Sequence, residues 1–126
     1  MNKRILVIDD DLYLRELYEE ILKNAGYEID TAIDGQEGIE KIKQDGYDLV
    51  LLDMMMPKID GLGVLTQLSQ TQPPPKNGPV ILLTNLGHEP VIQEALQKGA
   101  TAYLIKADIT PDQLLEEVKK YLPTSI

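Results

Sequence analysis

Short, uninterrupted apolar runs recur along the chain and predict buried strands. They cover residues 5–8, 49–52, 80–83 and 102–105. Runs of this length are typical of strands that are buried on both faces, as in a parallel sheet. A fifth and weaker run at 27–32 alternates apolar and polar residues, which predicts an edge strand.

The segments between these runs have helical periodicity. Apolar residues at 14, 17, 18, 21 and 22 predict a first helix, and Gly26 supplies its stop. Similar spacing predicts helices around 39–42, 62–68 and 91–96. The last helix has the clearest start, because Thr110 can cap it, Pro111 suits its first position and Gln113 completes a capping box.

Strand and helix patterns alternate along the whole chain, which predicts an α/β fold with a parallel sheet and right-handed crossovers. The 126 residues fit one compact domain, so we expect a single domain over 1–126. Residues 71–79 have the proline and glycine content of a linker. Cutting there would leave halves too small to bury a core, so we interpret the segment as a long loop.

The composition of the chain disfavours or excludes several classes of function. A formal net charge of -9 disfavours direct binding of nucleic acid or anionic lipid. The chain has no cysteine, which excludes disulfides, thiolate metal sites and thiol chemistry. No apolar stretch is long enough for a signal peptide or for membrane insertion, so a cytoplasmic location is expected.

Polar side chains follow the apolar runs at their carboxyl ends. They are Asp9, Asp10, Asp53, Thr84 and Lys106. In an open parallel sheet these ends share one edge, and ligands bind there at the point where the strand order reverses. If the order is 2-1-3-4-5, the three aspartates meet, with Thr84 and Lys106 beside them.

Three neighbouring carboxylates repel one another unless a cation joins them. With Lys106 they sum to a charge of -2, which one divalent ion cancels. An open site of oxygen ligands suits Mg²⁺, which accepts phosphate oxygens as further ligands. Beside such an ion, Asp53 is equipped to attack phosphorus. Asp10 or Asp53 taken singly is better explained as a helix cap or turn former, so the metal site is predicted only from the combination of residues.

With these residues in these positions, the sequence resembles the receiver domain of bacterial two-component response regulators, which has the chemotaxis-type fold. The resemblance rests on four segments in order: "ILVIDDD", "LVLLDMMMPKIDG", "VILLT" and "AYLIK". It implies a three-layer, flavodoxin-like (βα)5 sandwich with a parallel five-stranded sheet in the order 2-1-3-4-5. It also implies a signalling domain that accepts a phosphoryl group on itself and removes it again, rather than a conventional turnover enzyme.

The resemblance also implies a role for each residue. Asp53 would be the phosphoacceptor. Mg²⁺ would be bound by Asp10, Asp53 and the backbone carbonyl of Met55, with Asp9 acting through water. Lys106 would pair with Asp53 or with its phosphoryl group.

The switch would use Thr84, whose hydroxyl moves toward the phosphoryl group, and Tyr103, whose ring fills the space that is vacated. The surface of the fourth helix, fifth strand and fifth helix would then change shape for partner binding. The expected partners are a sensor histidine kinase or phosphotransfer protein and a downstream protein target. A phosphorylation-dependent dimer is a further expected form.

Two positions depart from the family pattern. Ala107 stands where a proline usually follows the lysine through a cis bond. A cis bond without proline costs about 3–4 kcal/mol, so we expect a trans bond and a rearranged loop. Asn85 stands where a smaller residue is usual after Thr84, and we expect it to narrow access to the phosphoryl group.

Three other functions compete with this interpretation. An aspartyl-phosphate phosphatase of the haloacid dehalogenase group would need a D-x-D pattern and a cap domain, whereas Asp9 and Asp10 are adjacent. A flavodoxin-like cofactor module would need a phosphate-binding loop where "DDDLYL" repels phosphate. A docking-only receiver, no longer regulated by phosphorylation, stays open because of Ala107. The sequence also leaves open whether the chain is a stand-alone protein or part of a longer one.

Overall fold

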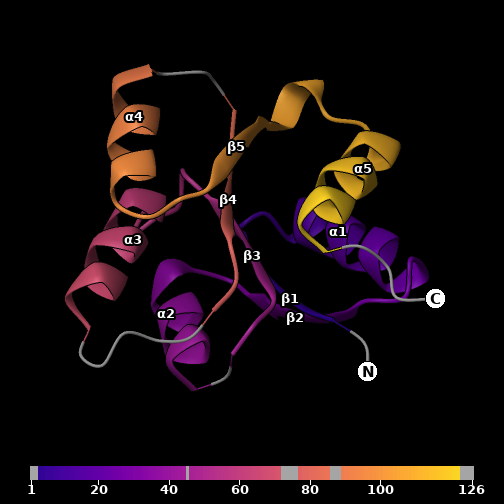
Figure 1. Ribbon diagram of the computed structural model, residues 1–126, viewed down its shortest axis with the longest axis horizontal. Coiled ribbons are helices and arrows are strands. Elements are labelled where there is room, and N and C mark those ends of the chain that lie inside the picture. The colour runs from indigo at the N-terminus through magenta and orange to yellow at the C-terminus, as the bar shows by residue number, and fades with distance from the viewer. Residues whose placement is uncertain (1–2, 45, 72–76, 86–88, 123–126) are drawn as a thin grey trace.

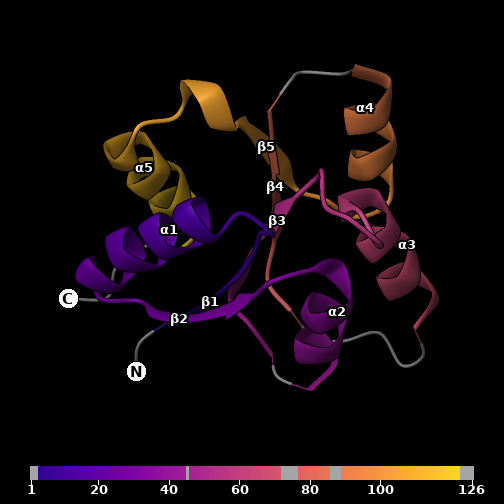
Figure 2. The ribbon, with the colours of Figure 1, turned by 180° about the vertical axis from the view of Figure 1, so that it is seen from behind.

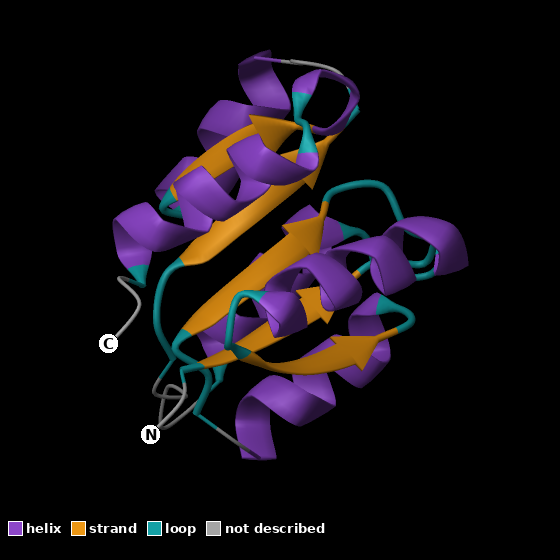
Figure 3. Cartoon of the chain, turned by 90° about the vertical axis from the view of Figure 1, so that its right-hand side faces the viewer, coloured by secondary structure: helices purple, strands orange, loops and turns teal. Residues whose placement is uncertain are grey.

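The five apolar runs form the strands of one parallel sheet. The computed structural model describes residues 3–44, 46–71, 77–85 and 89–122. The sheet order is β2-β1-β3-β4-β5, as predicted, and all of its strands run in one direction (Figure 3). The strands are β1 (Arg4–Ile8), β2 (Glu28–Ala32), β3 (Leu49–Asp53), β4 (Val80–Thr84) and β5 (Ala102–Ile105).

Helices cover both faces of the sheet and make three layers. Figures 1 and 2 show two of them, α1 and α5, together on one side, and the other three on the opposite side. Each face buries its own apolar cluster against its helices. The helices are α1 (Leu12–Asn24), α2 (Gly35–Gln44), α3 (Gly61–Gln70), α4 (Glu89–Gln97) and α5 (Pro111–Tyr121).

The helix ends confirm the local signals and correct the boundaries. Thr110 caps α5, and the capping box with Gln113 is present. Gly26 has the positive φ of 99° that ends α1. The first helix begins two residues earlier than its periodicity indicates, because Asp11 accepts a hydrogen bond from the Leu14 backbone and caps it.

The proline-rich segment 71–79 connects the end of α3 to the start of β4. Residues 72–76 are outside the described part of the chain, so its interpretation as a loop stays a prediction. The strand that follows it, β4, is a neighbour of β3 in the sheet. Among the described helices, none is both long enough and apolar enough to cross a membrane.

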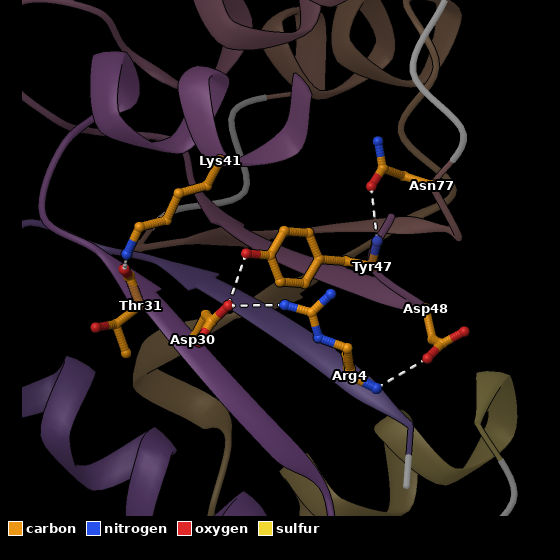
Figure 4. A network of polar contacts seen from close by, with 7 residues as sticks. All are labelled: Arg4, Asp30, Thr31, Lys41, Tyr47, Asp48 and Asn77. Atoms are coloured by element: carbon orange, nitrogen blue, oxygen red, sulfur yellow. Dashed lines mark hydrogen bonds and ion pairs between the residues drawn. The ribbon is translucent and has the colours of Figure 1, made fainter. Parts of the chain in front are cut away.

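A polar network ties the edge strand β2 to β1 and to Tyr47, which lies two residues before β3 (Figure 4). The Tyr47 hydroxyl donates to Oδ2 of Asp30 at 2.8 Å, and Arg4 Nη2 donates to the same oxygen at 3.1 Å. The Arg4 guanidinium also lies 4.7 Å from the centre of the Tyr47 ring. Because Tyr47 is buried and Asp30 lies on the outer strand, this contact holds the sheet edge through side chains as well as backbone.

We expect Tyr47→Phe to lower the free energy of unfolding by about 1 kcal/mol, the usual net contribution of such a hydrogen bond. The ring remains, so its packing and its contact with Arg4 are kept. Urea denaturation measures the change. Tyr13→Phe is the control, because the Tyr13 side chain is exposed. Equal stability of Tyr47→Phe and wild type would show that the hydroxyl contact contributes nothing.

Candidate functional site

Three aspartates meet at the carboxyl edge of the sheet. Asp53 is the last residue of β3, and Asp9 follows the last residue of the neighbouring strand β1. The strands are in register here, with Ile8 opposite Leu52, so the next residues along each strand are Asp9 and Asp53. One carboxylate oxygen each from Asp9, Asp10 and Asp53 lies within 4.8 Å of the others. The predicted cluster is therefore confirmed.

Asp9 is the most tightly held of the three. It is fully buried, and its Oδ1 accepts a hydrogen bond from the Asp11 backbone at 2.9 Å. Arg15 donates from Nη1 to the Asp9 carbonyl at 2.8 Å. Asp10, by contrast, is exposed. The sequence reasoning missed Arg15, although its place on the first turns of α1 puts it next to the end of β1.

Lys106 joins two of the carboxylates. Its Nζ lies 2.8 Å from Asp9 Oδ2 and 3.2 Å from Asp53 Oδ2, and only 6% of its side chain is exposed. The expected pairing with Asp53 is present, but the closer contact is with Asp9. Lys106 is the first residue of a short 3-10 turn, η1 (Lys106–Asp108), that follows β5 directly.

The loop after β3 folds back tightly against Asp53. Met55 donates its backbone N–H to Asp53 Oδ1 at 3.2 Å, and Gly61 donates to the Met54 carbonyl at 3.0 Å. A Cβ on Gly61 would lie only 2.8 Å from the Asp53 carbonyl, so this close approach requires glycine. Met54 and Met56 are buried, whereas 68% of Met55 is exposed. The loop is therefore anchored by Met54 and Met56, whose side chains are buried. The side chain of Met55, between them, is exposed to solvent.

Burial and charge perturb the carboxyl of Asp53. Burial, together with the negative charge of Asp9, raises the pKa of Asp53 to about 7, against the opposing effect of Lys106 and the Met55 N–H. Burial alone would lower the pKa of Lys106, but its hydrogen bond to Asp9 and the charges of Asp53 and Asp9 raise it above its ordinary value. Lys106 therefore stays positively charged, but its single charge does not neutralise the carboxylates of the cluster.

The donor set fits a divalent cation of the Mg²⁺ type. The cluster offers carboxylate oxygens alone, which are the ligands that Mg²⁺ prefers. Within the described residues, Asp9 Oδ2 is buried and takes no hydrogen bond beyond its ion pair with Lys106. A second positive charge at this point would relieve the repulsion that raises the pKa of Asp53.

Thr84 and Tyr103 lie on the strands beside the cluster. Thr84 is buried as the last residue of β4, one position beyond Leu83, which pairs with Asp53. It is opposite Ile105, the residue before Lys106. Tyr103 lies on the outer strand β5 and is 40% exposed. Their switching roles, like the trans bond before Ala107, stay predictions.

A parallel sheet in this order, with buried acids and a buried lysine at its carboxyl edge, defines a doubly wound α/β domain with a charged ligand site where the strand order reverses. The family model of the response regulator receiver domain matches residues 5–119, and the chain belongs to this family. It is a receiver domain of the two-component type, similar to CheY. Receiver domains are signalling domains rather than conventional enzymes, and they bind Mg²⁺ at an acidic pocket.

Relatives resemble the chain over nearly its whole length. Chemotaxis protein CheY of Treponema pallidum is 37% identical over 122 residues, which cover 94% of this chain and 82% of the relative. Sporulation initiation phosphotransferase F of Bacillus subtilis is 36% identical, with 98% and 96% covered. The structure of response regulator TrrA of Thermotoga maritima, in complex with Mg(2+)-BeF, has a TM-score of 0.80 and 41% identity, with 95% and 99% covered.

We expect the stability of the metal-free chain to depend on pH through Asp53. Its pKa is about 7 in the folded chain, whereas an unfolded chain gives about 4. Between these values the unfolded chain has released the proton that the folded chain keeps. The contribution of Asp53 to stability is therefore lost as the pH rises from about 4 to about 7.

Urea denaturation in the presence of a chelator tests this dependence. Asp53→Asn lacks the titration, so its advantage over wild type should grow from about pH 4 to about pH 7. Added Mg²⁺ should restore wild-type stability at the upper end, where it binds the ionised cluster. Parallel curves for the two chains across this range would contradict the assignment.

Proposed function

We propose that this receiver domain accepts a phosphoryl group on Asp53. The observation that carries the proposal is the position of the Asp53 carboxylate, buried in the acidic cluster with its Oδ2 3.2 Å from Lys106. A carboxylate oxygen of Asp53 attacks phosphorus, and the bond from phosphorus to the donor breaks. With a phosphohistidine donor, that bond is P–N and the imidazole leaves with its electron pair. Water later hydrolyses the acyl phosphate and regenerates the carboxylate.

Each neighbouring residue has a task in this transfer. Lys106 neutralises charge on the phosphoryl oxygens, and its contact with Asp9 fixes the position of its ammonium group. Asp10, Asp53 and the carbonyl of Met55 would hold Mg²⁺, and Asp9 would act through water, as the resemblance to receiver domains implies. Bound Mg²⁺ would supply charge neutralisation for the phosphoryl group.

The change in partner binding would follow from the negative charge of the phosphoryl group on Asp53. The phosphoryl group attracts the Thr84 hydroxyl, Tyr103 moves into the vacated space, and the α4-β5-α5 surface changes. Inverting such an equilibrium takes about 5.5 kcal/mol, which a few charge-assisted hydrogen bonds of about 1.5–3 kcal/mol each supply. A downstream protein would bind the altered surface. The alternative is a docking-only receiver that binds its partner without phosphorylation.

Intact mass spectrometry tests the acceptor. Wild-type chain incubated with Mg²⁺ and acetyl phosphate should gain one phosphoryl group, and Asp53→Asn should gain none. Lys106→Ala should reduce the gain strongly, because the phosphoryl charge loses its cation. A wild-type chain that gains no mass with either acetyl phosphate or phosphoramidate would favour the docking-only alternative.

A protein donor would have an apolar surface to contact. In the described part of the chain, four large exposed apolar side chains follow the ends of β1, β2 and β3, at the edge of the sheet that carries the acidic cluster. They are Leu12, Tyr13, Ile33 and Met55. Exposed apolar groups gathered in one place indicate a contact surface. Their position favours a histidine kinase or phosphotransfer protein as the physiological donor.

Replacing Leu12 and Tyr13 by Ser should separate the two kinds of donor. Transfer from an autophosphorylated histidine kinase should slow about tenfold, the usual scale for loss of central interface residues. Labelling by acetyl phosphate should be unchanged, because a small donor needs no such surface. Glu20→Ser, on the exposed side of α1, is the matched control. Equal slowing with both donors would mean that the substitutions damage the site itself.

A further inference from the structure

Arg15 lies next to the acidic cluster but pairs with none of its carboxylates. It is half-buried on the first turn of α1, and its Nη1 donates to the backbone carbonyl of Asp9 at 2.8 Å. Within the part of the chain that the structure describes, Arg15 forms no ion pair. A guanidinium group that binds a carbonyl, with carboxylates close by, has a task other than neutralising their charge.

The Asp9 carbonyl needs this donor because the sheet supplies none. Asp9 follows the last residue of β1, and its N–H still donates to the Ala32 carbonyl at 3.1 Å. Ala32 is the last residue of β2, so the ladder between the two strands does not continue to the Asp9 carbonyl. Asp9 is fully buried, and a buried carbonyl requires a hydrogen-bond donor. Arg15 is that donor.

The contact from Arg15 closes a ring of hydrogen bonds that starts and ends at Asp9. Asp11 donates its N–H to Asp9 Oδ1 at 2.9 Å. The carbonyl of Asp11 accepts from the backbone N–H of Arg15, also at 2.9 Å. The side chain of Arg15 then returns to the carbonyl of Asp9. The turn between β1 and α1 is therefore fixed at both ends, with Asp10 between them.

Asp10 depends on this turn for its position. Its side chain is exposed and accepts no hydrogen bond from the residues that the structure describes. One of its carboxylate oxygens nevertheless lies within 4.8 Å of oxygens of Asp9 and Asp53. The backbone alone thus places this carboxylate in the cluster. Mg²⁺ demands near-ideal octahedral geometry, so a ligand placed in this way is only as good as the turn that carries it.

We propose that Arg15 is a positioning residue of the metal site. Its bond to the Asp9 carbonyl fixes the turn between β1 and α1, and the turn holds the carboxylate of Asp10 toward Asp53. Arg15 is not itself a ligand, because a guanidinium group carries only donors. The inference rests on the ligand set of the proposed function, in which Asp10 binds the metal ion.

The sign of the change in metal affinity separates positioning from a simple effect of charge. Removing a positive charge close to a cation site strengthens binding of the cation. Losing the position of a ligand weakens it, and contacts that orient metal ligands typically change the affinity by about 10- to 100-fold. The two explanations therefore predict opposite results for a neutral residue at position 15.

Titration of Mg²⁺ into the isotopically labelled full chain tests the proposal, with the amide shifts of residues 9–11 and 53–55 followed by NMR. We expect Arg15→Met to weaken Mg²⁺ binding about tenfold. Arg15→Lys should recover part of the affinity, because its ammonium group can donate to the same carbonyl. Lys23→Met removes one positive charge from the last turn of the same helix and is the matched control. Its affinity should equal that of wild type.

Hydrogen exchange of the Asp11 amide gives a second readout that needs no metal. This N–H donates to Asp9 Oδ1, so it reports whether the turn stays closed. In the metal-free chain it should exchange about tenfold faster in Arg15→Met than in wild type, whereas Lys23→Met should leave it unchanged. If Arg15→Met does not fold, Arg15→Gln takes its place in both measurements, with the same expected direction.

The other outcomes overturn the proposal. Tighter Mg²⁺ binding by Arg15→Met would mean that Arg15 acts through its charge alone, and unchanged binding would mean that the turn needs no such contact. Asp10→Asn separates this inference from the proposed function. If Asp10→Asn leaves Mg²⁺ binding unchanged, the proposed ligand set is wrong and the inference is wrong with it. If Asp10→Asn weakens binding and Arg15→Met does not, only the role of Arg15 is wrong.

Discussion

The structure depends on one costly arrangement, the burial of two carboxylates beside a single ammonium group. Lys106 lies between Asp9 and Asp53 at 2.8 and 3.2 Å, and all three side chains are almost fully removed from water. Buried ions of this kind are favourable only when partners satisfy them. Here burial, together with the negative charge of Asp9, raises the pKa of Asp53, and one ammonium group is too few to offset both effects. The site is therefore prepared to take up a cation and then an anion.

The fold places the buried carboxylates at the edge of the sheet where a ligand can bind. Parallel pairing brings the ends of β1 and β3 side by side, so that Asp9 and Asp53 meet at the point where the strand order reverses. The backbone then fixes the geometry, since Asp11 and Met55 donate N–H groups to the two carboxylates. Burial of Met54 and Met56 anchors the loop that carries Met55. The free energy gained by strand pairing and core burial thus holds the carboxylates together against their mutual repulsion.

Sequence patterns could predict the parts of this arrangement that are local. Apolar runs indicated every strand, and the capping residues Thr110 and Gln113 indicated the start of α5. Asp53 and Lys106 were identifiable because each places a charge directly after a run of apolar residues. The contacts of Arg15 with Asp9 and of Tyr47 with Asp30 join residues whose distance depends on how helices and strands pack. No periodicity encodes such contacts, so they emerged only from the structure.

The way in which the acidic charges are compensated determines which ligand the site can take. At the sheet edge the carboxylates converge on one point and already share a lysine, a geometry that suits a small, hard cation. Within the described residues, no other group of acids converges closely enough to hold a metal ion. Because Lys106 follows β5 directly, the sheet itself positions the ammonium group that a metal ion would have to complement.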